Sequence, residues 1–556
     1  MAHPTITPWQ RLIGLMQLEK RDILQIFYYA IFSGIVALSL PLGIQTIINL
    51  IQGAQISTSW VVLVILVTLG VAFSGALQLM QLRIIETIQQ RIFTRSSFEL
   101  TYRFPKIKMT ELRNYYPPEL ANRFFDTLAI QKGLSKILID VPTAVLQILF
   151  ALLLLSFYHP FFIIFGVLLL LLIFVVFKFT AKKGLETSLV ESKNKYKVAH
   201  WIQEIARSIT SFKLSGNTNL ALGKNDHLVS HYLESRENHF KVLMMQFIQM
   251  VSFKVIVTAS LLLIGGALVL NQQMNIGQFV AAEIIILLVI ASVEKLILGL
   301  EPFYDVLTSL EKLGEIVDKD IENQEGEKPV FNGDISIELN EVSYRVPYRD
   351  SPIIYNASLH LNSKSRILIF GESGAGKSTL LRLIAGIIEP TAGYIYINNL
   401  SVNSLNLNHY RAQLGLSLTE ESPFDGTIKE NLTFGNADIS DDTIFDVLNK
   451  VGLIDFIKEQ PKGLQTLLNP DGKQVSHTVS KKIILARAIL KNPKVLILED
   501  ALDRFNPTET NAIIDYLTHP DRSWALVVVS GSDSWKLKCT QIIHLEKGEI
   551  KNIDHA

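Results

Sequence analysis

The sequence is poor in cysteine and in charged residues. It holds a single cysteine, Cys539, among 556 residues, so no disulfide can form within the chain. Lysine and arginine total 52 and aspartate and glutamate also total 52, which leaves no formal net charge. Binding to nucleic acid through a general excess of positive charge is therefore not expected. The first 22 residues mix polar and apolar side chains, so we expect no cleavable signal peptide there.

Hydrophobic residues, by contrast, make up 49% of the chain, which points to membrane spans. Six apolar stretches have lengths close to the ~20 residues that cross a bilayer. They lie at residues 23–50, 60–82, 141–158, 161–179, 242–270 and 276–300. We therefore predict an all-α, six-helix transmembrane domain over residues 23–314. The segment 1–22 has the pattern of an amphipathic helix at the bilayer surface, with a frayed helix in solvent as the alternative.

The connectors between these stretches predict the orientation. The short connectors 51–59, 158–160 and 271–275 contain no lysine or arginine, whereas the long connectors 83–140 and 180–241 are rich in both. Basic loops stay on the cytoplasmic side, so we expect the long connectors and both ends of the chain to be cytoplasmic. The long connectors read as helices that continue out of the membrane, and Pro117 and Pro118 mark a place where the chain reverses.

Two charged residues lie inside the predicted spans. At ~1.5 Å per residue, Lys254 and Glu294 fall at depths within roughly 5 Å of each other. An ionisable group within a membrane is costly, and it is usually paired or lines a cavity. The pattern favours a structural ion pair, or helix ends that protrude into the cytosol, over a polar patch in a substrate path.

The second half of the chain contains a phosphate-binding loop. Its residues are Gly371, Glu372, Ser373, Gly374, Ala375, Gly376, Lys377, Ser378 and Thr379. They fit the pattern G-x-x-x-x-G-K-[ST], between an apolar strand-like run at 367–370 and a helix-like run at 380–385. The loop would present backbone amides to phosphate oxygens. Lys377 would reach the β- and γ-phosphates, and Ser378 would hold Mg²⁺. We predict a nucleotide-binding site.

The residues around this loop predict an α/β domain over 334–556. A charged, turn-prone segment, 315–333, reads as a linker. Strand-like runs at 336–339, 367–370, 394–397, 494–498 and 525–529 alternate with helical segments. Such alternation is typical of parallel strands, which we expect to surround the phosphate loop.

Three further stretches carry a family resemblance. Residues 424–431 read Phe-Asp-Gly-Thr-Ile-Lys-Glu-Asn, residues 485–493 read Leu-Ala-Arg-Ala-Ile-Leu-Lys-Asn-Pro, and Ile-Gly-Gln opens the last span at 276–278. With six spans before the nucleotide domain, the chain resembles a half-transporter of the ATP-binding cassette (ABC) exporter family. It looks most like the secretion exporters that pair with a periplasmic adaptor.

The resemblance implies a P-loop nucleotide domain that binds ATP and Mg²⁺ on the cytoplasmic side of a membrane, by analogy the bacterial inner membrane. It also implies a homodimer, or a heterodimer with another ABC half-transporter, embedded in the lipid bilayer. A periplasmic adaptor is a possible further partner, and nucleic acid is not. Short helices at 120–126 and 202–207 are candidates for docking onto the nucleotide domains, or else ordinary amphipathic helix.

Several family motifs are altered in this chain. The signature L-S-G-G-Q falls on Val-Ser-His-Thr-Val at 475–479, and the D-loop S-A-L-D on Asp-Arg-Phe-Asn at 503–506. The switch histidine position is Gly531, the glutamine position is Thr419, and the adenine-stacking aromatic falls at Val346. Branched side chains in place of the signature glycines should hinder close approach to a phosphate.

The acidic pair after the strand at 494–498 is also reordered. The family has aspartate and then glutamate, whereas this chain has Glu499 and then Asp500. We assign Glu499 to the Mg²⁺-bound water, with a weak catalytic role, and Asp500 to accepting a proton with a side chain one methylene shorter. A misplacement of ~1 Å can cost on the order of 10²-fold in rate.

Two functions follow from these residues. The first is an ABC exporter subunit that couples ATP to transport, with slow hydrolysis. The second is a nucleotide-binding pseudo-ATPase that acts as a regulatory or structural membrane partner. The intact phosphate loop favours the first, and the altered motifs keep the second open.

Overall fold

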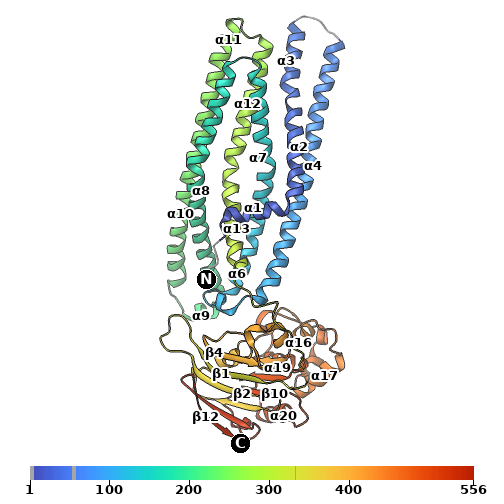
Figure 1. Cartoon of the computed structure of the whole chain (residues 1–556), viewed down its shortest axis with the longest axis vertical. Helices are drawn as coiled ribbons and strands as arrows, with labels where there is room; N and C mark the ends of the chain where they lie inside the picture. The colour runs from blue at the N-terminus through green and yellow to red at the C-terminus, as the bar shows by residue number, and fades with distance from the viewer. Residues whose placement is uncertain (1–5, 53–57, 332, 556) are drawn as a thin grey trace. The chain divides into compact units, whose positions relative to one another are not determined.

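The computed structural model describes residues 6–52, 58–331 and 333–555, and it divides the chain into two compact units (Figure 1). The first unit, here called the membrane unit, comprises Met1–Pro105 and Asn114–Lys319. The second, the nucleotide unit, comprises Lys106–Arg113 and Asp320–Ala556. Each unit has hydrophobic cores of its own.

The regular secondary structure of the membrane unit, over its described residues, is helical. The long ones are α2 (Lys20–Ala37), α3 (Ser39–Gln52), α4 (Thr58–Arg103), α7 (Asp126–Ser156), α8 (Phe161–Arg207), α10 (Leu220–Ser260), α12 (Ile276–Leu298) and α13 (Leu300–Val317). The short ones are α1 (Pro8–Leu18), α6 (Pro117–Asn122), α9 (Ile209–Leu214) and α11 (Gly266–Leu270), and a π-helical turn, Leu261–Gly265, joins α10 to α11. This confirms the predicted helical transmembrane domain.

Five helical segments of the described residues are long and apolar enough to cross a membrane. The apolar start of α8, Phe161–Leu171, is a sixth and shorter candidate. Together they correspond to the six predicted spans. The helices also continue well beyond their apolar parts, since α4 has 46 residues and α8 has 47. At ~1.5 Å per residue either is about twice as long as a bilayer core of ~30 Å. Connector 51–59 lies largely outside the described residues.

The first predicted span has one irregular helical turn shortly before Pro41. The sequence predicts a kink without a break, and this is confirmed: Leu38, the one residue between α2 and α3, keeps helical backbone angles (φ −71°, ψ −15°), and Lys20–Gln52 forms one continuous helical segment. Ala37 is four residues before Pro41, and a proline ring clashes with the carbonyl of the residue at that distance. The irregular turn therefore falls where the proline ring removes a helical hydrogen bond.

The predicted pairing of Lys254 with Glu294 is confirmed. The Lys254 Nζ atom donates to Glu294 Oε2 at 2.7 Å, which joins α10 to α12. The two side chains are 43% and 34% exposed, so the pair is only partly enclosed by the chain. Equal depth along two neighbouring helices was enough to predict the contact.

Removing one partner of this pair should cost more stability than removing both. Lys254→Met or Glu294→Gln alone leaves a charge without its counter-ion, whereas the double substitution leaves none. For such a partly exposed pair we expect a coupling free energy of about 1 kcal/mol. Thermal unfolding of the four proteins in lipid nanodiscs measures it, and strictly additive effects would contradict a stabilising pair.

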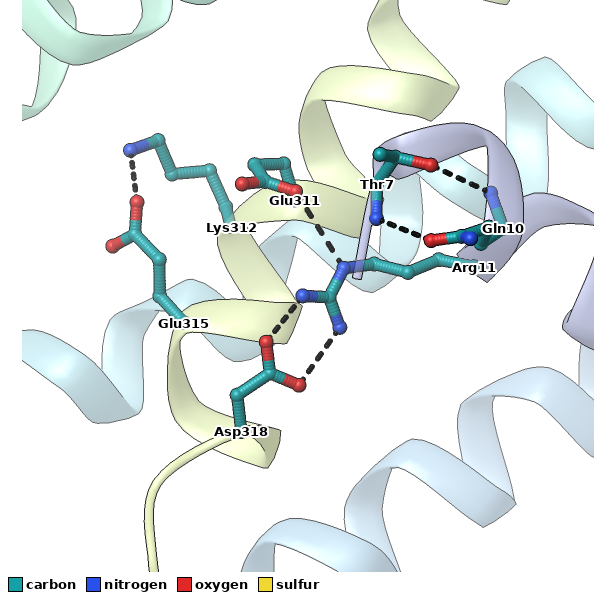
Figure 2. Close-up of polar contacts among 7 residues, drawn as sticks. All are labelled: Thr7, Gln10, Arg11, Glu311, Lys312, Glu315 and Asp318. Carbon is teal, nitrogen blue, oxygen red and sulfur yellow. Dashed lines mark hydrogen bonds and ion pairs between the residues drawn. The ribbon is translucent and has the colours of Figure 1, made fainter. Parts of the chain in front are cut away.

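The N-terminal helix α1 is fixed to the end of α13 by an arginine. Figure 2 shows Arg11 reaching across to α13, where its Nη1 atom donates to Asp318 Oδ1 at 3.0 Å and its second terminal nitrogen donates to Asp318 Oδ2. The Nε atom of Arg11 lies 3.5 Å from Glu311. Thr7 and Gln10 form a capping box that begins the helix. Trp9 and Ile13 remain about half exposed, as a helix at the bilayer surface would require.

Gly314 makes room for this arginine. A Cβ atom at residue 314 would lie 2.2 Å from Arg11 Cζ. Gly314→Ala should therefore displace Arg11 and release α1 as Arg11→Ala does, with a loss of about 1–2 kcal/mol for the charged hydrogen bonds. Limited proteolysis and thermal unfolding report the release. In an Arg11→Ala background the Gly314→Ala change should have little further effect, and a full additional loss would disprove the steric explanation.

The nucleotide unit contains two larger sheets. A six-stranded sheet has the order β12-β11-β3-β10-β9-β6, and a four-stranded antiparallel sheet has the order β2-β1-β4-β5. The strands are β1 (Ile337–Tyr344), β2 (Ile354–Leu361), β3 (Arg366–Phe370), β4 (Ala392–Ile397), β5 (Leu400–Ser401), β6 (Leu414–Ser417), β9 (Val495–Glu499), β10 (Ala525–Val529), β11 (Gln541–Glu546) and β12 (Glu549–His555), with β7 (Gly426–Thr427) and β8 (Leu467–Leu468) forming a small third ladder.

The helices of this unit are short. They are α5 (Met109–Leu112), α14 (Lys377–Ile384), α15 (Leu407–Arg411), α16 (Ile428–Thr433), α17 (Asp441–Lys450), α18 (Ile454–Glu459), α19 (His477–Leu490) and α20 (Pro507–Leu517). Cys539 is buried between the sheet and these helices, in a cluster that includes Trp535 and Leu526.

All five predicted strands are present, but not all lie beside the phosphate loop in parallel. Of the predicted strands, β3, β9 and β10 are parallel as expected, and β6 and β11, which were not predicted, join the same sheet in parallel. The runs at 336–339 and 394–397 instead form β1 and β4, which pair antiparallel in the other sheet. Both strands alternate buried and exposed residues over part of their length, which is typical of an antiparallel sheet with one solvated face.

A short piece of the first long connector belongs to the nucleotide unit. Ile107 forms an isolated antiparallel bridge with Ile321, and Lys108 lies 3.0 Å from Glu389. Glu322 in turn accepts two hydrogen bonds from Arg411, at 2.7 and 2.8 Å. Part of the segment 315–333 is therefore held by the unit that follows it. The docking helices predicted at 120–126 and 202–207 stay predictions.

Candidate nucleotide site

The phosphate loop lies at the carboxyl end of β3, in the middle of the six-stranded sheet. The chain leaves β3 at Phe370, turns through residues 371–376 and enters α14 at Lys377. Gly374 and Gly376 have φ angles of 83° and 103°, which favour glycine. A Cβ atom at residue 371 would lie 2.1 Å from the carbonyl oxygen of Leu545. The glycines are thus required by the shape of the loop.

The side chain of Lys377 folds back onto the start of the loop. Its Nζ atom donates to the carbonyl oxygens of Gly371 at 2.6 Å and Glu372 at 2.8 Å. The ammonium group therefore sits at the loop where a phosphate would be held. Ser378 and Thr379 follow in the first turn of α14, whose N-terminus faces the same space.

The acidic pair lies two strands away, at the end of β9. Glu499 is the last residue of β9 and is 6% exposed, and its Oε2 atom accepts a hydrogen bond from the Thr419 amide at 3.1 Å. Asp500 has a φ angle of 45°, and its amide donates to Val529 on β10. Burial raises the pKa of Asp500, and the nearby carboxylates of Asp503 and Glu499 raise it further. Lys377 acts on Asp500 in the opposite direction.

A buried lysine, which sequence reasoning missed, holds the loop that contains Thr419. Lys481 on α19 is 5% exposed, and its Nζ atom donates to the carbonyl oxygens of Leu418 at 3.2 Å and Thr419 at 3.0 Å. Burial lowers the pKa of Lys481. Glu421 accepts from the Leu418 amide at 3.2 Å. The sequence did hold a signal for this contact, namely two adjacent lysines, Lys481 and Lys482, within an otherwise largely apolar helix. Because lysine is rarely buried without a partner, such a pair indicates polar partners elsewhere in the chain.

The altered motifs take ordinary structural roles. Ser476 caps α19 by accepting from the Val479 amide at 3.2 Å, and Asn506 caps α20. Gly531 follows β10, and a Cβ atom there would meet nothing within 4 Å. Tyr348, near the adenine-stacking position, is 99% exposed, whereas the hydroxyl of Tyr344 accepts from Arg113. The structure thus brings these residues together at the carboxyl ends of the parallel strands: the phosphate loop follows β3, Glu499 and Asp500 lie at the end of β9, and Thr419 follows β6.

Two family profiles match the chain. Residues 23–293 match the family model of the ABC transporter transmembrane region, and residues 354–503 match the family model described as ABC transporter. Among solved structures, a bacterial Atm1-family ABC exporter with ATP bound superposes with a TM-score of 0.82, over 96% of this chain and 95% of that one. Sequence identity to it is 17%, so this likeness concerns the fold.

Curated relatives match over part of their length. The ATP-dependent permease MDL1 of Candida albicans is 32% identical over 42% of this chain and 35% of the relative. The alpha-hemolysin translocation ATP-binding protein HlyB of Escherichia coli O157:H7 is 28% identical over 55% and 43%. A putative export ATP-binding/permease protein of Rickettsia bellii is 26% identical over 66% and 64%. The match thus spans about a third to two thirds of these relatives.

With both family models matched in one polypeptide and an exporter fold over 96% of it, the chain belongs to the ABC transporter family, as an exporter half-transporter.

Proposed function

We propose that this protein is an ABC exporter subunit that binds ATP with Mg²⁺ and hydrolyses it slowly during transport. The observation that carries the proposal is the contrast within one site. The phosphate loop has its full sequence and the strand–loop–helix shape, whereas the positions around it that serve hydrolysis in the family are replaced.

The residues present fit a bound nucleotide. The turn at 371–376 is kept open by glycines, and the lysine ammonium that would meet the phosphates now rests on two loop carbonyls. Mg²⁺ at such sites needs only one or two protein oxygens besides phosphate and water. Ser378 would supply a hydroxyl, and Glu499 a carboxylate of which one oxygen is held by the Thr419 amide. Bound Mg²⁺ would neutralise phosphate charge.

The same residues fit hydrolysis less well. Asp500 would accept the proton from the attacking water, but its side chain is one methylene shorter than the glutamate at this position in the family. Gly531 offers no side chain to the γ-phosphate, and Thr419 replaces a glutamine. Because oriented groups of this kind act together, we expect turnover well below the ~1–100 s⁻¹ usual for kinases.

The partner and the setting are also proposals. ABC half-transporters combine two nucleotide domains, so the signature segment 475–479 of this chain would face the phosphate loop of a second copy or of a different half-transporter. We place the protein in the bacterial inner membrane with the nucleotide unit in the cytoplasm. A periplasmic adaptor as a further partner fits the likeness to the alpha-hemolysin translocation protein.

A second candidate function is a pseudo-ATPase, in which bound ATP holds a conformation without being consumed in each cycle. One observation favours it. Lys481 and Glu499 hold both sides of Thr419, through its carbonyl and its amide. A loop whose backbone carbonyl and amide at Thr419 are both hydrogen-bonded to side chains is poorly suited to move each time a nucleotide binds or leaves.

Nucleotide binding and turnover of the purified protein in nanodiscs test both candidates. We expect saturable, Mg²⁺-supported binding of ATP and slow phosphate release, increased by reconstitution with a competent partner half-transporter if the protein is a heterodimer. Binding with no phosphate release under any condition would favour the pseudo-ATPase. Absence of ATP binding would contradict both, and hydrolysis at several per second by the protein alone would contradict the proposed impairment.

A further inference from the structure

A cavity of about 770 Å³ lies among α6, α8, α10 and α13 of the membrane unit. Lys193, Lys197 and Trp201 line it from one face of α8, since residues four apart on a helix lie on the same side. Lys224 lines it from α10 and Lys312 from α13. Its volume falls within the ~300–1,000 Å³ of most small-molecule sites, so a small ligand fits there.

Each of the three carboxylates that line this cavity already has a partner. The pairs are Glu119 with His200 at 2.9 Å, Glu204 with Arg207 at 2.7 Å, and Glu315 with Lys312 at 2.7 Å and with Arg123. Figure 2 shows the contact between Lys312 and Glu315. These carboxylates are therefore not free to neutralise the other cations of the cavity.

Carboxylates outside the cavity wall do not neutralise them either. Asp126 accepts a hydrogen bond from the hydroxyl of Tyr196, and Glu311 forms an ion pair with Arg11. Asp226 is on α10 but is not among the residues that line the cavity.

Three lysines of the cavity keep their charge available. In the part of the chain that the structure describes, Lys193, Lys197 and Lys224 form no ion pair with a carboxylate. The Nζ atom of Lys197 donates to the amide oxygen of Asn194 at 3.1 Å, and that of Lys224 lies 4.0 Å from the centre of the Trp201 ring. An aromatic face attracts a cation without cancelling its charge. With five cations and three carboxylates in its wall, the cavity has an excess of positive charge.

Arg123 gives a second, independent indication of a ligand. It lines the same cavity and is only 6% exposed, and its buried Nε atom has no hydrogen-bond partner among the described residues. A buried charged donor without an acceptor is costly. The guanidinium group is suited to phosphate and carboxylate oxygens, so an anion in the cavity would supply the acceptor that the chain does not.

The position of the cavity favours a ligand from the aqueous phase. Lys193 is 14 residues beyond residue 179, where the fourth predicted span ends. At ~1.5 Å per residue this places it roughly 20 Å past the apolar part of α8. The cavity therefore lies outside the bilayer core, on the side of the membrane that is predicted to be cytoplasmic.

We propose that this cavity binds a small, water-soluble polyanion, with its phosphate or carboxylate groups beside Lys193, Lys197 and Lys224. The helix α6 belongs to the first long connector, whereas the end of α8 and the start of α10 belong to the second. A bound anion would thus join the two connectors and hold these helices together. The proposal goes beyond the proposed function, because no residue of the phosphate loop takes part.

Pyrophosphate and inorganic phosphate are the probes for this site. They are dialysed against the full-length protein in phosphatidylcholine nanodiscs, without Mg²⁺ or nucleotide, and uptake by empty nanodiscs is subtracted. The protein carries Lys377→Ala, so that the phosphate loop does not take up the probe. One pyrophosphate per chain should bind saturably and roughly fivefold more tightly than phosphate, the size of one further partly exposed charge contact. No saturable binding of pyrophosphate, or equal affinity for both anions, would overturn the proposal.

Variants of the three lysines test where the probe binds. Lys193→Gln, Lys197→Gln and Lys224→Gln should each weaken pyrophosphate binding by roughly fivefold, and by about 100-fold together, because separate contacts add. Lys183→Gln removes an exposed lysine ten residues earlier on α8, outside the cavity, and is the matched control that should change the affinity little. Thermal unfolding without pyrophosphate checks that each variant is folded. Unchanged affinity in the folded single variants would overturn the proposal.

Anionic lipid distinguishes a soluble ligand from a lipid head group. The same dialysis is repeated in nanodiscs that contain phosphatidylglycerol, at 0.15 M salt, where charges more than about 8 Å apart are largely screened. We expect the pyrophosphate affinity to stay the same, because the cavity lies well away from the lipid surface. A loss of pyrophosphate binding would assign the cavity to a lipid head group and would overturn the proposal of a soluble ligand.

Discussion

Replacing Lys377 by alanine is expected to abolish ATP binding at working concentrations. The ammonium group is the only side-chain cation of the phosphate loop, and without it the loop amides alone would face the phosphate charge. A hydrogen bond to a charged group contributes about 1.5–3 kcal/mol. Two such bonds, to the β- and γ-phosphates, correspond to a loss of at least roughly 100-fold in affinity. Titration with a fluorescent ATP analogue measures this loss directly.

Lys364 provides the matched control for this variant. It is an exposed lysine of the nucleotide unit, two residues before β3, and its side chain has no part in the loop. Lys364→Ala should bind ATP as the unchanged protein does. Nearly normal ATP affinity in Lys377→Ala would mean that the nucleotide is bound elsewhere. The assignment of residues 371–379 as the phosphate-binding loop would then be wrong.

Restoring the altered catalytic positions together is expected to raise ATP hydrolysis by about 10²-fold, because correct placement within ~1 Å can be worth that much. The variant combines Gly531→His, Glu499→Asp, Asp500→Glu, His477→Gly and Thr478→Gly. The structure leaves room for the histidine, since a Cβ atom at residue 531 meets no other atom within 4 Å. Steady-state phosphate release is the measurement.

Any one of these changes should accomplish little alone, because groups that act as a unit contribute non-additively. Gly223→His, at an equally open glycine on α10, controls for the introduced imidazole. The two new glycines fall in the first turn of α19 and should lower stability by about 1 kcal/mol each, so thermal unfolding is followed alongside. A folded combined variant with unchanged turnover would show that the replaced motifs do not limit the rate.

The parts of the molecule that local chemistry dictates could be predicted from the sequence. The phosphate loop is recognisable because its glycines and its lysine act within nine consecutive residues. The Lys254–Glu294 contact followed from the fixed rise of a helix, which places residues at known depths wherever the helix packs. The strand at 494–498 was visible as an apolar run, and β9 occupies almost the same residues.

Other features depend on residues far apart in the chain. Lys481 reaches Thr419 across 62 positions, and no local pattern links a lysine in one helix to a carbonyl in a distant loop. The assignment of 336–339 and 394–397 to the parallel sheet was wrong for a related reason. Periodicity identifies a strand but not the strand with which it pairs. β1 pairs with β4, although β3, which lies between them in the sequence, belongs to the other sheet.

The burial of Cys539 makes the thiol chemistry of this protein unusually simple. Burial raises the pKa of that thiol to about 12, so the nucleophilic thiolate is scarce at neutral pH. Maleimides and mild oxidants should leave the folded protein unmodified and its nucleotide affinity intact. A cysteine introduced at an exposed position would then be the one reactive thiol, and distances between labelled positions could be followed during nucleotide binding without first removing the natural residue.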